Sequence, residues 1–96
     1  MTRAESSILL HSLQNENGID NHYRLLRSLD PFHGNDVFSI FVTTQNKETV
    51  DDEFVYDIAR DESTAIRRFS LICRENVCAC TLADVLQDLM TEETIA

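Results

Sequence analysis

Three cysteines close together in the chain are the side chains most capable of chemistry. Cys73, Cys78 and Cys80 form a C-x4-C-x-C spacing, and thiolates bind soft metal ions. A structural zinc site needs four ligands, usually in C-x2-4-C pairs, so a fourth ligand such as His33 would have to come from a distant loop. Thiols near the start of a helix also tend to have a lowered pKa. These cysteines therefore support one hypothesis, a thiol- or metal-dependent sensor.

The histidines, serines and acidic runs do not form a recognisable constellation. His11, His22 and His33 have no nucleophile or carboxylate at the spacing of a catalytic triad or a metal clip. The chain has no G-x-S-x-G elbow and no glycine-rich phosphate loop. The acidic run at residues 51–53 lacks the alternating oxygen ligands of a calcium loop. We therefore predict no enzymatic activity, no catalytic residue, no bound metal and no cofactor.

Two amphipathic helical patterns occupy the last third of the chain, with Cys73 in the first and Cys78 and Cys80 shortly before the second. Asp61 or Ser63 can cap the first helix, which we expect to start near residue 62, and Asn76 favours a left-handed stop. Thr81 opens a capping-box-like start for the second helix. Two helices joined by so short a turn must fold back and pack on one neighbour. Their apolar positions repeat at helical spacing: Ala65, Ile66, Phe69, Ile72 and Cys73, then Leu82, Val85, Leu86, Leu89 and Met90.

The neighbour on which these helices pack must come from the first sixty residues. Asn17-Gly18 is a strong hairpin signal, because both residues tolerate positive φ in a type I′ turn. It predicts an antiparallel pair of strands at residues 6–13 and 21–29. The alternation in this pair is imperfect, so the inward face stays open. A helix over residues 4–13 is the competing interpretation.

Two further strands follow the hairpin. Residues 37–44 are β-branched or aromatic at nearly every position, which favours a central strand. In residues 53–59, Phe54, Tyr56 and Ile58 alternate with Val55 and Asp57. Four strands followed by two helices, without β-α-β alternation, predict an α+β fold. We expect an antiparallel four-stranded β-meander followed by a C-terminal helical hairpin packed on one face of the sheet.

A chain of 96 residues, with 43% apolar residues and few glycines or prolines, predicts one compact domain. We expect a single domain over residues 1–96. Its expected parts are frayed ends at 1–5 and 91–96, a strand-rich half at 6–59 and two helices at 60–90.

Charge and cysteine usage restrict the partners and the compartment. Eight basic and seventeen acidic residues leave a formal charge of −9, which disfavours binding to nucleic acids and to anionic membranes. The apolar run Ile8, Leu9, Leu10 is too short for a signal peptide or a membrane span. Three cysteines, an odd number, suit reduced thiols rather than a disulfide framework. We therefore expect a cytoplasmic protein.

Several short motifs in the last part of the chain carry a resemblance. They are Asp57-Ile58, Leu71-Ile72-Cys73, and Asp84-Val85-Leu86 with Asp88. Over residues 57–90 the chain resembles a domain-of-unknown-function family of short, uncharacterised bacterial proteins, common in clostridia and their relatives. Cys78 departs from the family pattern, in which that turn is usually polar or contains proline. The resemblance implies a small cytoplasmic bacterial protein, and it transfers no catalytic or ligand residue.

The first helical pattern also carries a cluster of basic residues. Half of the eight basic residues, Arg60, Arg67, Arg68 and Arg74, lie within fifteen positions, and Leu71 sits among them away from the apolar stripe. One interpretation is a solvated helix whose arginines pair with the carboxylates at its start. The other is a partner-contact surface formed by Arg67, Leu71 and Arg74, because arginine beside an exposed apolar side chain is typical of interfaces. We predict a protein–protein interaction or regulatory module, with a second copy of this acidic chain as the simplest partner.

Overall fold

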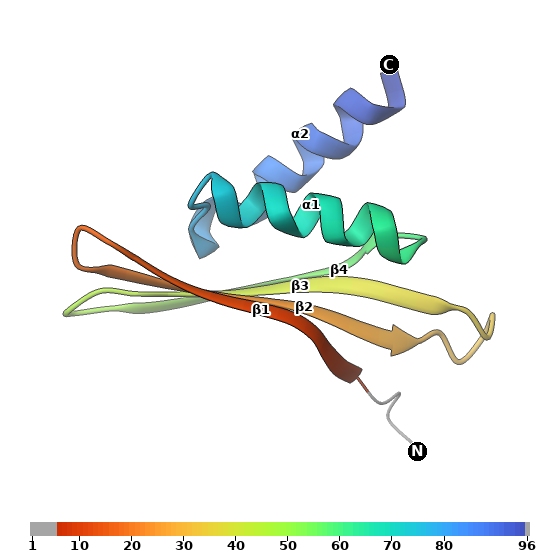
Figure 1. Ribbon diagram of the computed structural model, residues 1–96, viewed down its shortest axis with the longest axis horizontal. Helices are drawn as coiled ribbons and strands as arrows, with labels where there is room; N and C mark the ends of the chain where they lie inside the picture. Colours follow the sequence, from red (N-terminus) through yellow and green to blue (C-terminus); the bar gives the residue numbers. More distant parts are fainter. Residues whose placement is uncertain (1–5, 96) are drawn as a thin grey trace.

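Four antiparallel strands form one sheet, and the two helices that follow lie on the same side of it (Figure 1). The computed structural model describes residues 6–95. The elements are β1 (Ser6–Glu16), β2 (Ile19–Leu29), β3 (Asp36–Gln45), β4 (Val50–Ala59), α1 (Glu62–Arg74), a 3₁₀ turn η1 (Ala79–Thr81) and α2 (Leu82–Ile95). The sheet order is β1-β2-β3-β4, so each strand pairs with its neighbour in the sequence. The predicted α+β meander with a C-terminal helical hairpin is confirmed.

The two ends of the chain differ in how far the structure describes them. Residues 1–5 and 96, part of the ends expected to fray, lie outside the described residues. Residues 91–95 continue α2 beyond the position where the sequence pattern stops. Within residues 6–95, no helix is both long enough and apolar enough to cross a membrane.

The β1–β2 hairpin turns at the predicted position. Asn17 and Gly18 have φ values of 54° and 79°, which match a type I′ turn whose twist suits the flanking strands. The turn sets the register, so His11 lies opposite Arg24. Residues 6–13 belong to β1, so the competing helix over residues 4–13 is wrong in the part that the structure describes.

The buried side chains show which face of the hairpin points inward, and a bulge in β1 brings Leu9 to that face. The register shifts between Ile8 and Leu10, which lets Leu9 pack against the core. Across the hairpin, Leu25 is fully buried, whereas Leu26 is half-buried and points to the other face.

A second bulge interrupts the pairing of β3 with β4. Val55 pairs with Ile40, but Ala59 pairs with Phe38, so three residues of β4 lie opposite the single residue Ser39 of β3. Asp57 lies within this bulge at φ 59°, a conformation that few non-glycine residues adopt.

The bulge breaks the alternation that the sequence predicts for β4. Phe54 and Tyr56 remain exposed on one face, at 48% and 56%. Ile58, two positions further along, is fully buried in the core on the opposite face. The expected alternation of Phe54, Tyr56 and Ile58 therefore fails at Asp57, because the inserted residues turn the chain over.

A side-chain cap marks the start of α1, and a residue with positive φ follows its end. The Asp61 carboxylate accepts from the backbone N–H of Thr64 at 2.9 Å and from the hydroxyls of Thr64 and Ser63. These hydrogen bonds, led by that of the Thr64 backbone, lower the pKa of Asp61 to about 2. Asn76 follows the helix with φ 51°, as its residue type predicts.

The second helix starts at the predicted position, but its Thr81 side chain makes a different hydrogen bond from that of a capping box. The turn η1 precedes it, and the Thr81 hydroxyl donates to the Cys78 carbonyl oxygen at 3.3 Å. The helix itself begins at Leu82, directly after the predicted cap residue Thr81.

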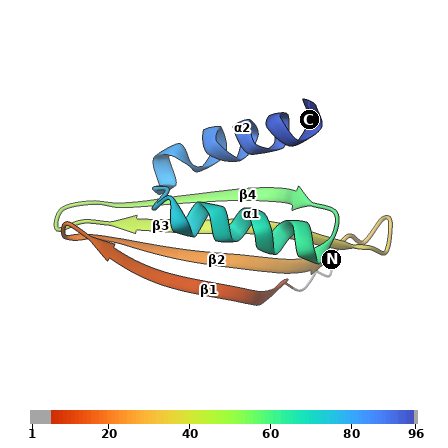
Figure 2. The same ribbon diagram turned by 45° about the horizontal axis from the view of Figure 1, so that its top comes forward.

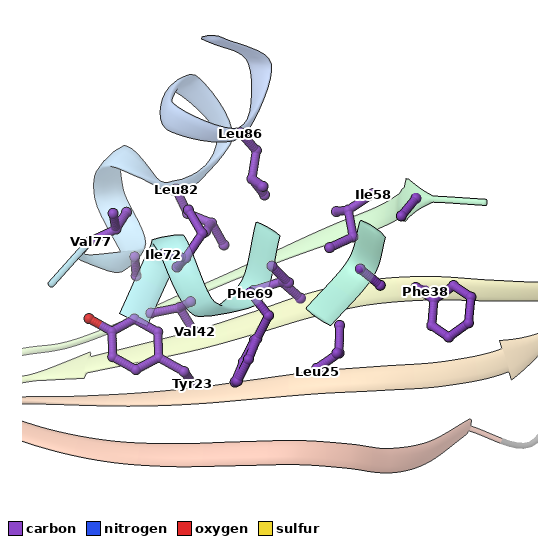
Figure 3. Packing of buried hydrophobic residues seen from close by; sticks show 14 residues of the cluster. Tyr23, Leu25, Phe38, Val42, Ile58, Phe69, Ile72, Val77, Leu82 and Leu86 are labelled. Carbon is purple, nitrogen blue, oxygen red and sulfur yellow. The ribbon is translucent and has the colours of Figure 1, made fainter. Parts of the chain in front are cut away.

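The core lies between the helices and one face of the sheet (Figure 3). Figure 2 shows α1 running above β2 and β3, with α2 leaning over β4. The predicted helical stripes supply five of the fourteen buried residues that the structure describes in this core, although Ile66 remains 36% exposed. Fully burying each such side chain contributes about 1.5–3 kcal/mol. The fully buried large apolar side chains are Tyr23, Leu25, Ile40, Val42, Ile58, Ile72, Leu82 and Leu86.

A buried polar chain fastens the turn between the helices to the sheet. The backbone N–H of Ala79 donates to the Thr44 hydroxyl at 2.8 Å. That hydroxyl donates in turn to the Asn21 side-chain oxygen at 2.6 Å. Asn21 is only 5% exposed, so this chain satisfies polar groups that would otherwise destabilise the fold.

Candidate interaction surface

The face of the sheet opposite the helices is open among the described elements (Figure 1). We call it the open face, and it is formed by alternate residues of all four strands. The register aligns its side chains in rows across the sheet. One row is His11, Arg24, Phe41 and Phe54, and the next is Leu13, His22, Thr43 and Asp52.

Large apolar side chains are exposed on the open face. Ile8 is 57% exposed and Leu13 is 69% exposed, in addition to the two aromatic residues of β4. Ring centroids lie 6.4 Å apart for Phe41 and Phe54, and 6.5 Å apart for Phe54 and Tyr56. These three rings therefore form a continuous aromatic ridge across β3 and β4.

The β1–β2 half of the open face carries cationic and imidazole side chains. The Arg24 guanidinium lies 5.3 Å from the centroid of the Phe41 ring, within cation–π range. Its Nη2 donates to His22 Nδ1 at 2.9 Å, so that nitrogen is the acceptor and the ring proton is on Nε2. Burial, then the charges of Arg24 and His11, lowers the pKa of His22.

Formal charge is sparse on the open face. Between the β1–β2 turn and the β4 bulge, the register places Arg24, Asp20 and Asp52 there. The whole chain carries eight basic and seventeen acidic residues. Most of the negative charge therefore lies elsewhere on the molecule.

The contact surface predicted on α1 is a smaller feature. Arg67 and Arg74 are exposed on the helix, and Leu71 between them is half-buried. Arg74 Nε lies 3.6 Å from Glu75 Oε1, a surface pair of small energetic value. The three residues all lie on α1. Their role as a contact surface stays a prediction.

Two further arginines, Arg68 on α1 and Arg27 on β2, connect this helix to the sheet. Arg68 donates to the carbonyl oxygen of Ile58 at the end of β4. Glu62 lies 3.8 Å from Arg27 on β2. Part of the arginine cluster therefore has a structural role, and the carboxylate at the start of the helix pairs with a strand residue.

The cysteines do not form the site that their spacing suggested. Among residues 6–95, no three cysteine, histidine or carboxylate side chains are grouped so that they could hold a metal ion. Burial raises the pKa of Cys73 to about 11, and the neighbouring Cys78 raises that of Cys80. The expected lowering of the thiol pKa is therefore wrong for Cys80, and the sensor hypothesis gains no support.

His33 lies at the opposite end of the sheet from the cysteines. Its Nδ1 is 2.7 Å from Asp30 Oδ2 in the β2–β3 loop, and the Phe32 backbone N–H, then His33, lowers the pKa of Asp30. From Asp36 to Thr44, β3 spans about 26 Å at about 3.3 Å per residue. A pocket of about 320 Å³ adjoins this loop, lined by Asp30, His33, Asn35, Val37, Asp57 and Arg60.

One polar atom in the core lacks a hydrogen-bond partner within the described part of the chain. The Tyr23 hydroxyl is fully buried and unpaired there. Burial, followed by the nearby Cys73 and Cys78, raises the pKa of Tyr23 to about 12. The phenol is therefore neutral at physiological pH.

Comparisons with protein-family models, curated proteins and solved structures gave no match to this chain. The resemblance of residues 57–90 to short bacterial proteins therefore stays a prediction. Residue-level evidence about function comes from the geometry of the two faces of the sheet.

Sequence reasoning did not single out the open face. Phe41 follows an apolar residue and precedes another, so the pattern of β3 marks both faces as buried. Phe54 and Tyr56 carried a signal in their alternation, but the bulge at Asp57 directs them away from the core. Their exposure becomes evident only when the helices are placed.

Proposed function

We propose that this chain is a small cytoplasmic interaction module that binds another protein through the open face of its sheet. The main observation is that the helices pack on one side of the sheet, while the other side exposes an aromatic ridge on β3 and β4 and the aliphatic side chains of Ile8 and Leu13 on β1. Exposed apolar patches of this kind mark contact sites.

The composition of the open face favours a protein as its ligand. Aromatic residues and arginine are enriched at the centres of protein interfaces, where charged residues are depleted. Phe41, Phe54, Tyr56 and Arg24 match that composition. The formal charge of −9 disfavours nucleic-acid phosphates.

Photo-crosslinking in living cells that produce this protein tests the proposal. A benzoylphenylalanine at position 54 replaces an aromatic side chain that is already 48% exposed. We expect a discrete protein adduct that disappears when Tyr56→Lys is added, because the lysine disrupts the aromatic ridge. The same probe at Gln87, exposed on α2, serves as the control.

Two results would contradict this proposal. One is an adduct yield at position 54 no higher than at position 87. The other is an adduct that survives Tyr56→Lys, since its formation would then not depend on the apolar surface.

A further inference from the structure

We propose that the partner on the open face is a second copy of this chain, stacked face to face around a two-fold axis parallel to the strands. The axis runs between β2 and β3, so β1 of one copy covers β4 of the other. This inference rests on the proposed function, because it names the protein that the open face binds. Three properties of the face support it: its area, its charge and the arrangement of its side chains.

The open face is large enough for a stable dimer. Four strands about 4.8 Å apart, each about ten residues long, span about 19 by 33 Å, or about 600 Å². Stacking two such faces buries on the order of 1,200 Å² in total, the lower limit of specific interfaces. Exposed side chains such as Leu13 and Tyr56 rise above the sheet, so the buried area exceeds this flat estimate.

The charge distribution favours this face for contact between two acidic copies. Two chains of charge −9 repel each other over most of their surfaces. The part of the open face between the turn and the bulge carries Arg24 against Asp20 and Asp52. A copy that approaches along this face therefore meets little net charge.

The two halves of the open face are complementary to each other. The β1–β2 half presents His11, His22 and Arg24, and the β3–β4 half presents the aromatic ridge and Asp52. Arg24 already stacks on an aromatic ring within its own chain, 5.3 Å from the centroid. A two-fold axis along the strands places each half over the opposite half, so His11 faces Phe54 and Arg24 faces Phe41 of the other copy.

A two-fold axis that also lies between the two sheets but runs across the strands gives a less favourable interface. It would place β1 over β1 and β4 over β4, so imidazole and guanidinium groups would face each other. Like charges placed opposite each other weaken an interface. In the arrangement that we propose, the two sheets form a sandwich, about 10 Å apart, with the helices on its outer sides.

Sedimentation velocity over a range of concentrations tests for the dimer. We expect the wild-type chain to pass from monomer to dimer as its concentration rises. Phe54→Lys should raise the dimer dissociation constant about tenfold or more, because the interface would bury an unpaired charge. Ile66→Lys, a matched apolar-to-lysine change on α1, should leave the dissociation constant unchanged.

Folding of each variant is checked separately by far-ultraviolet circular dichroism and thermal unfolding. Tyr56→Lys, at a side chain that is 56% exposed, replaces Phe54→Lys if the latter lowers the unfolding midpoint. A wild-type chain that stays monomeric at every concentration overturns the second copy as partner. A dimer that tolerates both substitutions but is lost with Leu71→Glu overturns the open face as the site of self-association, because the contact would then lie on α1.

Mixing two monomeric variants tests the orientation. In the proposed dimer, position 11 on β1 faces position 54 on β4 of the other copy. His11→Glu and Phe54→Lys should each weaken self-association, whereas their equimolar mixture should dimerise, because one contact is native and the other pairs Glu with Lys. Rescue by a mixture of Phe54→Lys and Phe54→Glu instead would place β4 over β4 and overturn the orientation.

The crosslinking experiment separates this inference from the proposed function. An adduct of twice the chain mass at position 54 supports both. An adduct with a different protein, together with a monomeric purified chain, retains the interaction module and overturns the second copy. Absence of both the adduct and the dimer overturns both proposals.

Discussion

The two faces of one sheet differ in what their side chains do. On the covered face, Leu25 and Val42 are fully buried against the helices. On the open face, the adjacent residues Leu26 and Phe41 are only half-buried. The same strands therefore supply the core on one side and an accessible apolar surface on the other. Packing within the chain accounts for the apolar residues of the covered face. The apolar residues of the open face imply contact with another molecule.

The polar groups of the two faces show the same contrast. On the covered face, the Thr44 hydroxyl links a backbone N–H to Asn21 in a closed, buried arrangement. On the open face, Arg24 and His22 pair with each other at partly exposed positions. Buried pairs of the first kind specify the fold, and accessible groups of the second kind remain available to another molecule.

The largest expected effect comes from one pair of leucines on opposite faces. Leu25→Ala should lower the free energy of unfolding by about 2–5 kcal/mol, because it leaves a cavity in the core. Leu13→Ala, at a side chain that is 69% exposed, should change the unfolding free energy of the monomer by less than about 0.5 kcal/mol. Urea unfolding at a dilute protein concentration measures both. Similar losses in the two variants would show that the faces do not differ in their role.

The adjacent threonines of β3 give a sharper contrast with a smaller effect. Thr44→Val should lower the unfolding free energy by about 1–3 kcal/mol, because it leaves the Ala79 N–H unpaired in a buried site. Thr43→Val, on the open face, should be nearly neutral, since valine suits a strand. The same urea titrations compare the two. Equal stability of both variants would contradict the role assigned to Thr44.

The Asp61 cap at the start of α1 gives a pH-dependent test of how the helices that cover the sheet are stabilised. Because the folded-state pKa of Asp61 is lowered to about 2 from 3.8, the carboxylate stabilises the fold above about pH 4. That contribution is lost as the pH falls toward 2. Asp61→Ala should therefore lower the thermal midpoint at pH 7, and its difference from wild type should shrink between pH 4 and pH 2.

Asp61→Asn is the matched control for the cap, because its amide oxygen retains an acceptor without titrating in this range. It should stay closer to wild type at pH 7 than the alanine variant does. A difference between wild type and Asp61→Ala that persists unchanged to pH 2 would rule out the charged cap as its cause.

The smallest effect is expected at the unpaired hydroxyl in the core. Tyr23→Phe removes a buried polar atom without a partner in the described residues, so the unfolding free energy should stay constant or rise by about 1 kcal/mol. Tyr56→Phe on the open face should leave the monomer unchanged. Chemical denaturation of both variants measures the effect, and a loss of stability in Tyr23→Phe would show that the hydroxyl has a partner.

The fold could be predicted largely because its signals are local. Asn17-Gly18 fixes a turn by its tolerance of positive φ, and the Asp61 side chain caps α1 through residues three positions away. The helical stripes need only the helical period to be recognised. These features depend on short stretches of chain, so one sequence is sufficient to place them.

The surface could not be predicted because it depends on which face the helices cover. Adjacent apolar pairs such as Leu25 and Leu26 leave both faces of a strand plausible until the helices cover one of them. The bulge at Asp57 rests on the three-dimensional pairing of β3 with β4. The cluster of arginines on α1 was visible in the sequence, but the aromatic ridge formed by Phe41, Phe54 and Tyr56 was not.

Hydroxyl-radical footprinting across a dilution series tests the contrast between the faces most directly. Tyr23 and Phe38, both on the covered face, should be protected at every concentration. Phe54 and Tyr56 should react in the dilute monomer and become protected as the concentration rises, while Ile66 on α1 stays equally reactive. Protection of Phe54 and Tyr56 in the dilute monomer, or their full reactivity at all concentrations, would contradict an open face that binds a second copy.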